Sequence, residues 1–327
     1  MIPTRHPMND VINRRGNLII DGAMSTALEK KGLVLNDALW SARALITAPD
    51  LVREVHYDYF VAGADAAITD SYQASEAGFA AQGIDAQEAA RLVRLSVQLA
   101  AEAREDYLRD HPEKANRKAD LLIAGACGPY GAYLADGSEY TGRYTLSREE
   151  YVRFHELRVN ALIDGGADIL AFETQPRLDE IEALLAMIEH RDITCWVTVT
   201  LGEDGRMPDG TDMATLGRVL SAYPQVEAAG LNCVKREAAG PALAELGRTF
   251  KGALAIYPNS GETYDPVTKT WHSAPGSAHD WAHYVPLWRN LGVRCFGGCC
   301  RTLPKDIVEI VRILNEDQRQ TFLGTAY

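Results

Sequence analysis

The chain has 327 residues, of which 46% are hydrophobic and 24% are charged, and its formal net charge at pH 7 is −12. This composition is typical of a globular protein with a sizeable core, and an α/β barrel of this length folds as one domain. The negative charge argues against nucleic-acid binding, which requires a basic surface. The chain has no apolar signal core and no run that could span a bilayer, so we expect a cytoplasmic protein outside the membrane.

Short apolar runs alternate with amphipathic helices along the whole chain. Eight of these runs are typical of strands, at 17–21, 65–70, 121–126, 168–172, 194–200, 226–231, 253–257 and 293–296. Helices are expected at 22–31, 49–62, 87–109, 147–164, 178–190, 213–222, 238–250, 278–291 and 305–314. Alternating strands and helices predict a parallel sheet, and eight such units predict a closed (β/α)8 TIM barrel.

Polar residues end several of the predicted strands, which favours a closed barrel over an open doubly wound sheet. These residues are Asp21, Asp70, Glu173, Cys233, Asn259 and Cys299. In a barrel such positions converge on one face, where active sites lie, whereas in an open sheet they would spread along an edge. We therefore predict one α/β domain over 17–315, with an N-terminal extension at 1–16 and a C-terminal tail at 316–327.

Two adjacent cysteines, Cys299 and Cys300, follow two glycines at the end of the eighth predicted strand. Thiolates suit Zn²⁺, and a catalytic zinc site uses three protein ligands and leaves one position open. Cys233, which ends the sixth predicted strand, is the best candidate for the third ligand. Thr302 is expected to cap the last predicted helix, whose N-terminus would favour ionised thiols. By itself the pair is equally compatible with core packing, since buried cysteines behave as small hydrophobic residues.

Seven segments carry a wider pattern. In chain order they are DGAMSTALE at 21–29, ITDSYQAS at 68–75, GPYGAYLADGSEY at 128–140, ET at 173–174, GLNC at 230–233, YPNSGE at 257–262 and GGCCRT at 297–302. With these segments, the chain resembles the homocysteine S-methyltransferases from about residue 18 to 314, and most closely their bacterial S-methylmethionine-dependent branch. It differs from the usual family pattern at Ser25, Asp70, Cys127 and Arg143.

The resemblance implies a fold, a cofactor and a reaction. It implies a (β/α)8 barrel with one Zn²⁺ per chain, held by Cys233, Cys299 and Cys300, and methyl transfer to the thiolate of L-homocysteine to give methionine. The substrate-binding residues that we expect on this basis are Asp21, Met24, Ser25, Glu173, Asn232, Asn259 and Ser260. Zinc suits this chemistry because coordination deprotonates a thiol whose free pKa is about 8.5. Asp21 could instead cap a helix, and the Asn259–Ser260 pair could simply form a turn.

The segment 128–145 is a polar, tyrosine-rich loop that a barrel would place over its active-site face. Its Tyr130, Tyr133 and Glu139 suit a cation, because aromatic faces and carboxylates attract positive charge. A methyl donor that carries a sulfonium fits this requirement. Because the chain has no glycine-rich nucleotide loop, we expect S-methylmethionine to be the better donor and S-adenosylmethionine the weaker one.

Other interpretations remain open at this point. The same chemistry could act on selenocysteine, or use betaine or methylfolate as the donor. A thiol redox protein could form a vicinal disulfide between Cys299 and Cys300, without Cys233 and without a metal. A barrel stabilised by a non-catalytic zinc ion is a further alternative. Oligomeric state cannot be derived from the sequence.

Overall fold

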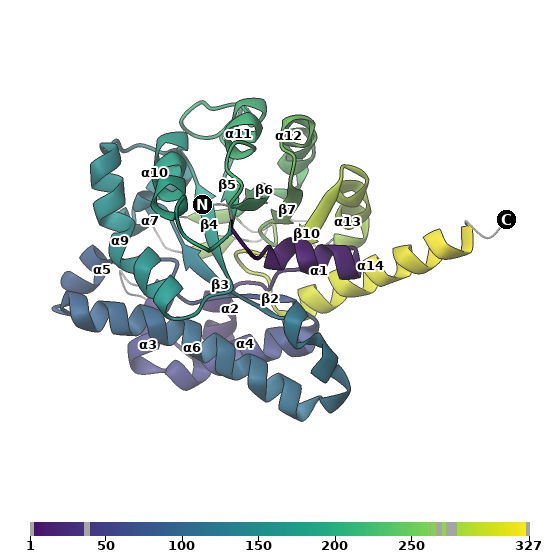
Figure 1. The fold of residues 1–327 in the computed structure, drawn as a ribbon, viewed down its shortest axis with the longest axis horizontal. Helices are drawn as coiled ribbons and strands as arrows, with labels where there is room; N and C mark the ends of the chain where they lie inside the picture. The colour runs from purple at the N-terminus through teal and green to yellow at the C-terminus, as the bar shows by residue number, and fades with distance from the viewer. Residues whose placement is uncertain (1–2, 36–39, 262, 266–269, 273–279, 325–327) are drawn as a thin grey trace.

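The structure is a computed structural model that describes residues 3–35, 40–261, 263–265, 270–272 and 280–324. Eight parallel strands form one sheet in the order β1-β10-β7-β6-β5-β4-β3-β2, surrounded by helices (Figure 1). A parallel bridge between Ile20 and Ala66 joins the two edges of this sheet, so the barrel is closed. The predicted (β/α)8 barrel is confirmed, and all eight predicted strands are present.

The strands of the barrel have the following bounds: β1 Leu18–Ile19, β2 Ala66–Ile68, β3 Leu122–Cys127, β4 Ile169–Gln175, β5 Cys195–Val199, β6 Val226–Asn232, β7 Ala253–Tyr257 and β10 Val293–Phe296. A separate antiparallel pair, β8 Thr263–Asp265 and β9 Thr270–His272, follows β7 and was not predicted.

Apart from α1, which was not predicted, the longer helices lie outside the strands, where the alternation predicted them. Their bounds are α1 Pro7–Arg15, α4 Pro49–Ala62, α6 Ala86–Asp110, α9 Arg148–Asp164, α10 Leu178–Ile188, α11 Met213–Leu220, α12 Arg236–Thr249, α13 Trp281–Asn290 and α14 Pro304–Gly324. Shorter helices are α2 Met24–Lys30, α3 Ala44–Thr47, α5 Glu76–Ala80, α7 Tyr130–Leu134 and α8 Ser138–Thr141, with 3-10 turns η1 at Trp40–Arg43 and η2 at Pro112–Asp120. None of the described helices is long and apolar enough to cross a membrane.

The barrel interior is packed with small side chains around one large one. Alanines from β2, β3, β4, β6 and β7 face inward, and the indole of Trp196 fills the space that they leave. The Trp196 Nε1–H donates to the hydroxyl of Tyr257 at 3.0 Å, so the one polar atom of this ring is satisfied. A larger apolar layer lies between the strands and the outer helices. The barrel is therefore a solid support for the face above Trp196.

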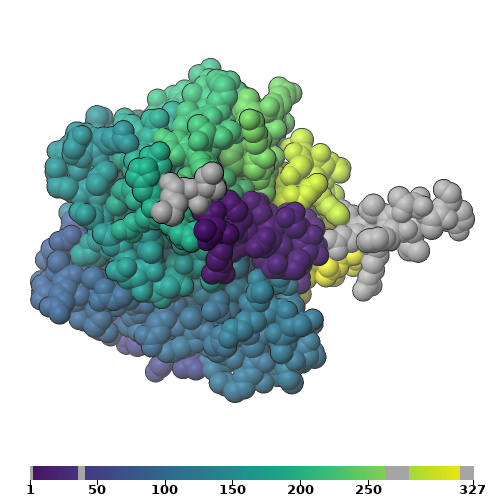
Figure 2. Space-filling view, in the orientation of Figure 1, coloured from purple at the N-terminus to yellow at the C-terminus, as the bar shows by residue number. Residues whose placement is uncertain are grey.

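The segment that we predicted as an N-terminal extension belongs to the core. Helix α1 lies across one end of the barrel, as Figures 1 and 2 show, and Met8 and Val11 are fully buried in the interior cluster. The Asn9 N–H donates to the buried Glu227 carboxylate at 2.7 Å, which fixes the helix there. The boundary at 316 also falls inside a helix, since α14 continues to Gly324. The described parts of both segments, residues 3–16 and 316–324, thus continue the fold.

Helix α4 contains a histidine whose environment makes folding sensitive to pH. His56 is fully buried, and neither ring nitrogen has a hydrogen-bond partner among the described residues. Burial lowers the pKa of His56 to about 3. The imidazole therefore stays neutral in the folded chain, while in the unfolded chain it takes up a proton near pH 6.5.

We predict that His56→Leu reduces the acid sensitivity of the protein. Below pH 6.5 the unfolded state binds a proton that the folded state does not, so His56 costs up to about 1.4 kcal/mol of unfolding free energy per pH unit, down to its folded pKa. Urea unfolding of wild type and variant between pH 7.5 and 4.5 measures this contribution. The free energy of the variant should fall less steeply with decreasing pH, and parallel curves would contradict the prediction.

Candidate active site

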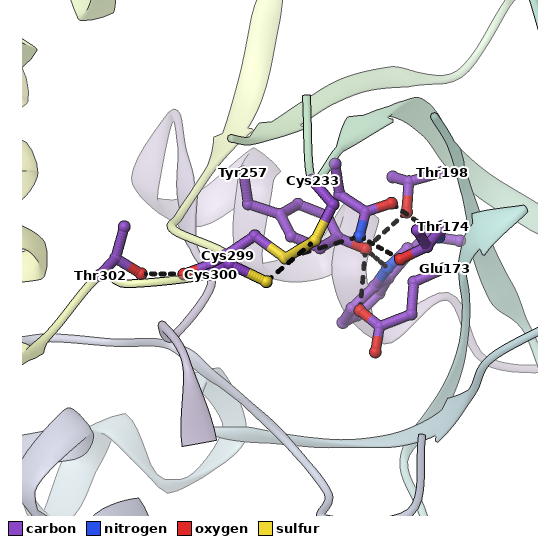
Figure 3. The surroundings of a disulfide bond; sticks show 10 residues. Glu173, Thr174, Thr198, Cys233, Tyr257, Cys299, Cys300 and Thr302 are labelled. Atoms are coloured by element: carbon purple, nitrogen blue, oxygen red, sulfur yellow. Dashed lines mark hydrogen bonds between the residues drawn. A yellow bond between two sulfur atoms is a disulfide. The ribbon is translucent and has the colours of Figure 1, made fainter. Parts of the chain in front are cut away.

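Three thiols meet at the C-terminal ends of two strands. Cys233 follows β6, Cys299 and Cys300 follow β10, and the three Sγ atoms lie within 4.8 Å of one another (Figure 3). The structure joins Cys233 to Cys299 in a disulfide, and the Cys300 Sγ lies 3.6 Å from that of Cys233. The vicinal Cys299–Cys300 disulfide of the redox alternative is therefore wrong: the bridge includes Cys233, which that alternative left out.

This donor set fits a metal ion once the thiols are reduced. Zn–S bonds of about 2.3 Å in tetrahedral geometry place two thiolates about 3.8 Å apart, close to the observed Cys233–Cys300 separation. Burial raises the pKa of the Cys300 thiol to about 12. Without a cation that thiol stays protonated, and a bound metal ion would ionise it. Three protein ligands would leave a fourth position for a substrate.

The backbone around these thiols is tightly constrained. A Cβ on Gly297 would lie 2.8 Å from the Cβ of Ile20, so only glycine lets the chain pass this close to β1. The Thr302 hydroxyl donates to the Cys299 carbonyl at 2.6 Å, which closes the turn. Thr302 is consequently not the predicted helix cap; α14 begins at Pro304, and the Asp306 carboxylate accepts from the Leu303 N–H at 2.8 Å.

Left-handed backbone conformations mark the same region. Thr174, Cys233 and Arg301 have φ angles of 58°, 51° and 67°. For residues other than glycine, each such conformation costs about 1–2 kcal/mol. Asn232 offsets this cost at Thr174, because its side-chain amide accepts from the Thr174 N–H and donates to the Thr174 hydroxyl, both at 2.7 Å. Strained residues held this firmly are typical of a functional site.

The thiols form one wall of a pocket that opens to solvent. Its lining comprises Gly22, Ala23, Met24, Ser25, Ser41, Ile68, Thr69, Asp70, Tyr72, Gln73, Glu139, Tyr140, Glu173, Thr174, Asn232, Cys233, Tyr257, Gly298, Cys299 and Cys300. Three of these residues carry carboxylates, and none of the described lining residues is lysine, arginine or histidine. The pocket is therefore suited to ligands with positive charge.

Glu173 lies on the pocket wall at the end of β4. Its Oε2 accepts from the Tyr257 hydroxyl at 3.2 Å, and that hydroxyl is also bonded to Thr198 at 2.6 Å (Figure 3). Burial raises the pKa of Glu173 to about 7, although the Tyr257 hydrogen bond opposes the shift. A cation that binds here would restore the ionised form and gain a charge-assisted hydrogen bond.

Asp21 lies at the end of β1 and does not cap the following helix. Its Oδ2 accepts from the Ile68 N–H at 2.9 Å, while Oδ1 has no partner among the described residues. Burial raises the pKa of Asp21 well above its usual value, the Ile68 N–H opposes this shift, and the charge of Glu173 adds to it. Asp21 is thus within electrostatic reach of Glu173, although it is not itself part of the pocket lining.

Asn259 and Ser260 connect the two cysteine-bearing loops through their backbones. The Asn259 N–H donates to the Val234 carbonyl at 3.2 Å, and the Ser260 N–H donates to the Cys300 carbonyl at 3.1 Å. Neither residue lines the pocket, and their side-chain oxygens have no partner among the described residues. The structure therefore places the pair next to the thiols and outside the pocket surface.

The tyrosine-rich segment folds into two short helices, α7 and α8, rather than the predicted loop. Glu139 and Tyr140 line the pocket, whereas Tyr130 and Tyr133 do not. The latter pair packs against Phe154, with ring centroids 4.9 and 5.6 Å away. Burial raises the pKa of the half-buried Glu139 to about 7, and its Oε2 is enclosed without a partner among the described residues.

A buried polar network beneath these helices was not predicted. Glu180 accepts from the Tyr130 N–H at 2.6 Å, from the Tyr144 hydroxyl at 2.6 Å, and lies 2.8 Å from His155. Arg158 bonds the carbonyls of Tyr72 and Gly128 at 2.5 and 2.6 Å. The network therefore positions α7 and the Tyr72 backbone. None of these side chains ends a strand, so strand-end reasoning could not find them.

Other pocket residues were also missed, among them Ser41, Thr69, Tyr72, Gln73, Tyr140, Thr174 and Tyr257. Most of them belong to segments that carry the family pattern, which was the available signal. Tyr72 illustrates why the signal was insufficient. Its ring lies so close to Gly128 that a Cβ there would come within 2.6 Å of it, and such a contact between two distant segments requires the folded chain.

Comparison with known proteins decides the family. A family model described as Homocysteine S-methyltransferase matches residues 18–314. The homocysteine S-methyltransferase of Escherichia coli (strain K12) is 46% identical over 306 residues, which cover 93% of this chain and 97% of that protein. The chain belongs to the homocysteine S-methyltransferase family. It is therefore a methyltransferase of class EC 2.1.1, and the family implies homocysteine as a substrate.

A solved structure and a second relative are also similar to this chain. The crystal structure of the homocysteine methyltransferase MmuM from Escherichia coli, in its metallated form, matches with a TM-score of 0.84 at 44% identity, covering 93% of this chain and 99% of that one. A selenocysteine methyltransferase from Astragalus bisulcatus is 37% identical over 330 residues, covering 96% of this chain and 98% of that protein. The metallated relative and the thiol cluster together support a metal site at Cys233, Cys299 and Cys300.

Proposed function

We propose that this enzyme transfers a methyl group from S-methylmethionine, and less efficiently from S-adenosylmethionine, to the thiolate of L-homocysteine. One Zn²⁺ per chain, held by Cys233, Cys299 and Cys300, would take part. The observation that carries the proposal is the pocket itself, in which three convergent thiols face buried carboxylates and no described basic residue. The ammonium of homocysteine and the sulfonium of the donor carry the positive charge that these carboxylates attract.

The residues of the chain divide the task. When bound, Zn²⁺ would supply the positive charge that lets the homocysteine sulfur bind as a thiolate. Glu173, fixed by Tyr257, would hold the homocysteine ammonium, and the nearby Asp21 adds negative charge. Met24, Ser25 and Asn232 would complete the homocysteine wall.

The donor would occupy the part of the pocket next to α8. Glu139 offers an enclosed, unpartnered carboxylate oxygen, and the rings of Tyr72 and Tyr140 line the same pocket. Carboxylates and aromatic faces stabilise a desolvated sulfonium, with about 0.5–2 kcal/mol from each cation–π contact. We assign Tyr130 and Tyr133 a supporting role, because they join α7 to Phe154 of α9 and do not line the pocket.

In the reaction, the homocysteine sulfur attacks the methyl carbon, and the bond from that carbon to the sulfonium sulfur breaks. The bonding electron pair remains on the leaving sulfur, so homocysteine and S-methylmethionine each become methionine, and the thiol proton is released. Alignment of the two sulfurs is the main contribution required of the protein, because no further proton transfer is needed.

The metal assignment predicts the composition of purified, reduced protein. We expect about one zinc per chain with sulfur ligands at about 2.3 Å, measured by elemental analysis and X-ray absorption. Cys233→Ala, Cys299→Ala and Cys300→Ala should each lose most of the zinc and the activity. Cys195→Ala, which removes a buried thiol within β5, is the control and should retain both. Full zinc content in Cys233→Ala would refute the assignment.

The homocysteine assignment predicts the effect of Glu173→Gln. Loss of a charge-assisted hydrogen bond to the ammonium costs about 1.5–3 kcal/mol, so homocysteine affinity should fall roughly 10- to 150-fold. Titration calorimetry measures the affinity, and zinc content should not change. Glu227→Gln removes a buried carboxylate that contacts α1 and should leave the affinity unchanged. Unaltered binding by Glu173→Gln would exclude Glu173 as the ammonium partner.

The donor assignment predicts a preference and a variant effect. At saturating homocysteine, kcat/KM should be higher for S-methylmethionine than for S-adenosylmethionine. Selenocysteine is tested separately as an alternative methyl acceptor. Glu139→Gln should lower kcat/KM for both donors by about tenfold, because it removes a charge facing the sulfonium. Asp136→Asn, an exposed carboxylate three residues earlier, is the matched control. A preference for S-adenosylmethionine or betaine would overturn the donor assignment.

A further inference from the structure

Asp70 is a buried carboxylate of the pocket to which the proposed chemistry gives no role so far. It follows β2, lines the pocket and is only 2% exposed. Ser41 donates a hydrogen bond to its carboxylate, and the other oxygen, Oδ2, has no partner among the described residues. Burial raises the pKa of Asp70 to about 7. A buried, half-satisfied carboxylate is costly unless a cation reaches it.

The fold does not use the Asp70 carboxylate to hold the end of β2. Neighbouring groups do this instead: the Thr69 N–H donates to the Ala124 carbonyl at 2.9 Å, and the Ser71 hydroxyl donates to the Ala126 carbonyl at 2.8 Å. These bonds hold the end of β2, while the Asp70 Oδ2 has no partner among the described residues.

A second acceptor lies near Asp70 in the chain. The Gln73 side chain donates through Nε2 to the Ala132 carbonyl at 3.1 Å, and its Oε1 has no partner among the described residues. Gln73 also lines the pocket. The segment after β2 thus contributes two unpartnered acceptor oxygens. An ammonium group, with three N–H donors, is the ligand chemistry that such acceptors fit.

The number of cationic groups on the two substrates equals the number of carboxylates in the described pocket lining, which leaves one cationic group for Asp70. Homocysteine brings one ammonium, and S-methylmethionine brings one ammonium and one sulfonium, while the described pocket lining contains three carboxylates, Asp70, Glu139 and Glu173. Glu173 lies in β4, two positions from β2 in the sheet, and Glu139 lies on α8. Each carboxylate therefore belongs to a different wall, and two of them already have a partner in the proposed function.

We propose that Asp70, with Gln73 beside it, forms a second ammonium subsite that binds the α-amino group of the methyl donor. The inference rests on the proposed function, because it takes the donor to be an amino acid. Asp70 then determines specificity: it favours sulfonium donors that carry an α-ammonium over those that do not.

The test compares two sulfonium compounds on the zinc-loaded enzyme. S-methylmethionine has the α-ammonium, and 3-(dimethylsulfonio)propionate lacks it. At saturating homocysteine, kcat/KM is measured for S-methylmethionine, and the propionate is assayed by its inhibition constant against S-methylmethionine. Asp70→Asn keeps the size of the side chain and an acceptor for Ser41, and Ser41→Ala keeps the charge. The KM for homocysteine shows whether each variant retains an intact pocket.

In Asp70→Asn we expect kcat/KM for S-methylmethionine to fall roughly 10- to 100-fold, because one charge-assisted hydrogen bond to the donor is lost. The inhibition constant of the propionate and the KM for homocysteine should stay within about twofold of wild type, as for sites without shared partners. In wild type, the propionate should bind more weakly than S-methylmethionine. Ser41→Ala should lie between wild type and Asp70→Asn.

The contrary outcomes are distinguishable. Suppose that wild type uses S-methylmethionine. If Asp70→Asn then leaves kcat/KM for S-methylmethionine unchanged, or weakens binding of the propionate by the same factor, the Asp70 assignment is wrong and the proposed function stands. A raised KM for homocysteine with unchanged donor kinetics would move Asp70 to the acceptor side and also overturn the inference. If wild type transfers no methyl group from S-methylmethionine, the donor assignment fails and the inference falls with it.

Discussion

Closure of the barrel is the constraint on which the active site depends. Cys233 follows β6 and the Cys299–Cys300 pair follows β10, and these strands are not neighbours, since β7 lies between them. Their thiols meet within 4.8 Å because parallel strands in a closed sheet direct all their C-terminal ends to one mouth. The loop after β7 then ties the two cysteine-bearing segments together through the backbone of Asn259 and Ser260. The metal site is in this sense a property of the sheet.

The second organising feature is a set of carboxyl groups in the pocket with no basic side chain beside them in the described lining. Burial raises the pKa values of Asp70, Glu139 and Glu173 each to about 7, and the described pocket lining contains no basic side chain. Such a site is destabilising when empty of cations and becomes favourable when cationic ligands enter. The free energy that the fold gives up here is available for the recognition of cationic groups.

The sequence predicted much of this arrangement because its signals are local. Apolar runs followed by amphipathic segments indicated every barrel strand and the outer helices. Polar residues at strand ends then indicated Glu173 and the cysteines. Prediction stopped where contacts join distant segments: α1 reads as a polar extension until Met8 and Val11 are seen inside the barrel. The Tyr130–Tyr133 pair reads as part of a cation site until Phe154 is seen to cover it.

The sequence by itself thus determined the barrel, the identity of the three candidate metal ligands and the homocysteine S-methyltransferase family, since each depends on residue order and spacing. Only the tertiary structure decided which polar side chains share the pocket. Asp70 and Glu139 line it, while Asn259 and Ser260 lie behind it. The physical reason is that burial and hydrogen-bond partnership depend on neighbours from other strands. A carboxylate such as Asp70 becomes a candidate ligand only when the fold leaves one of its oxygens buried and unpartnered.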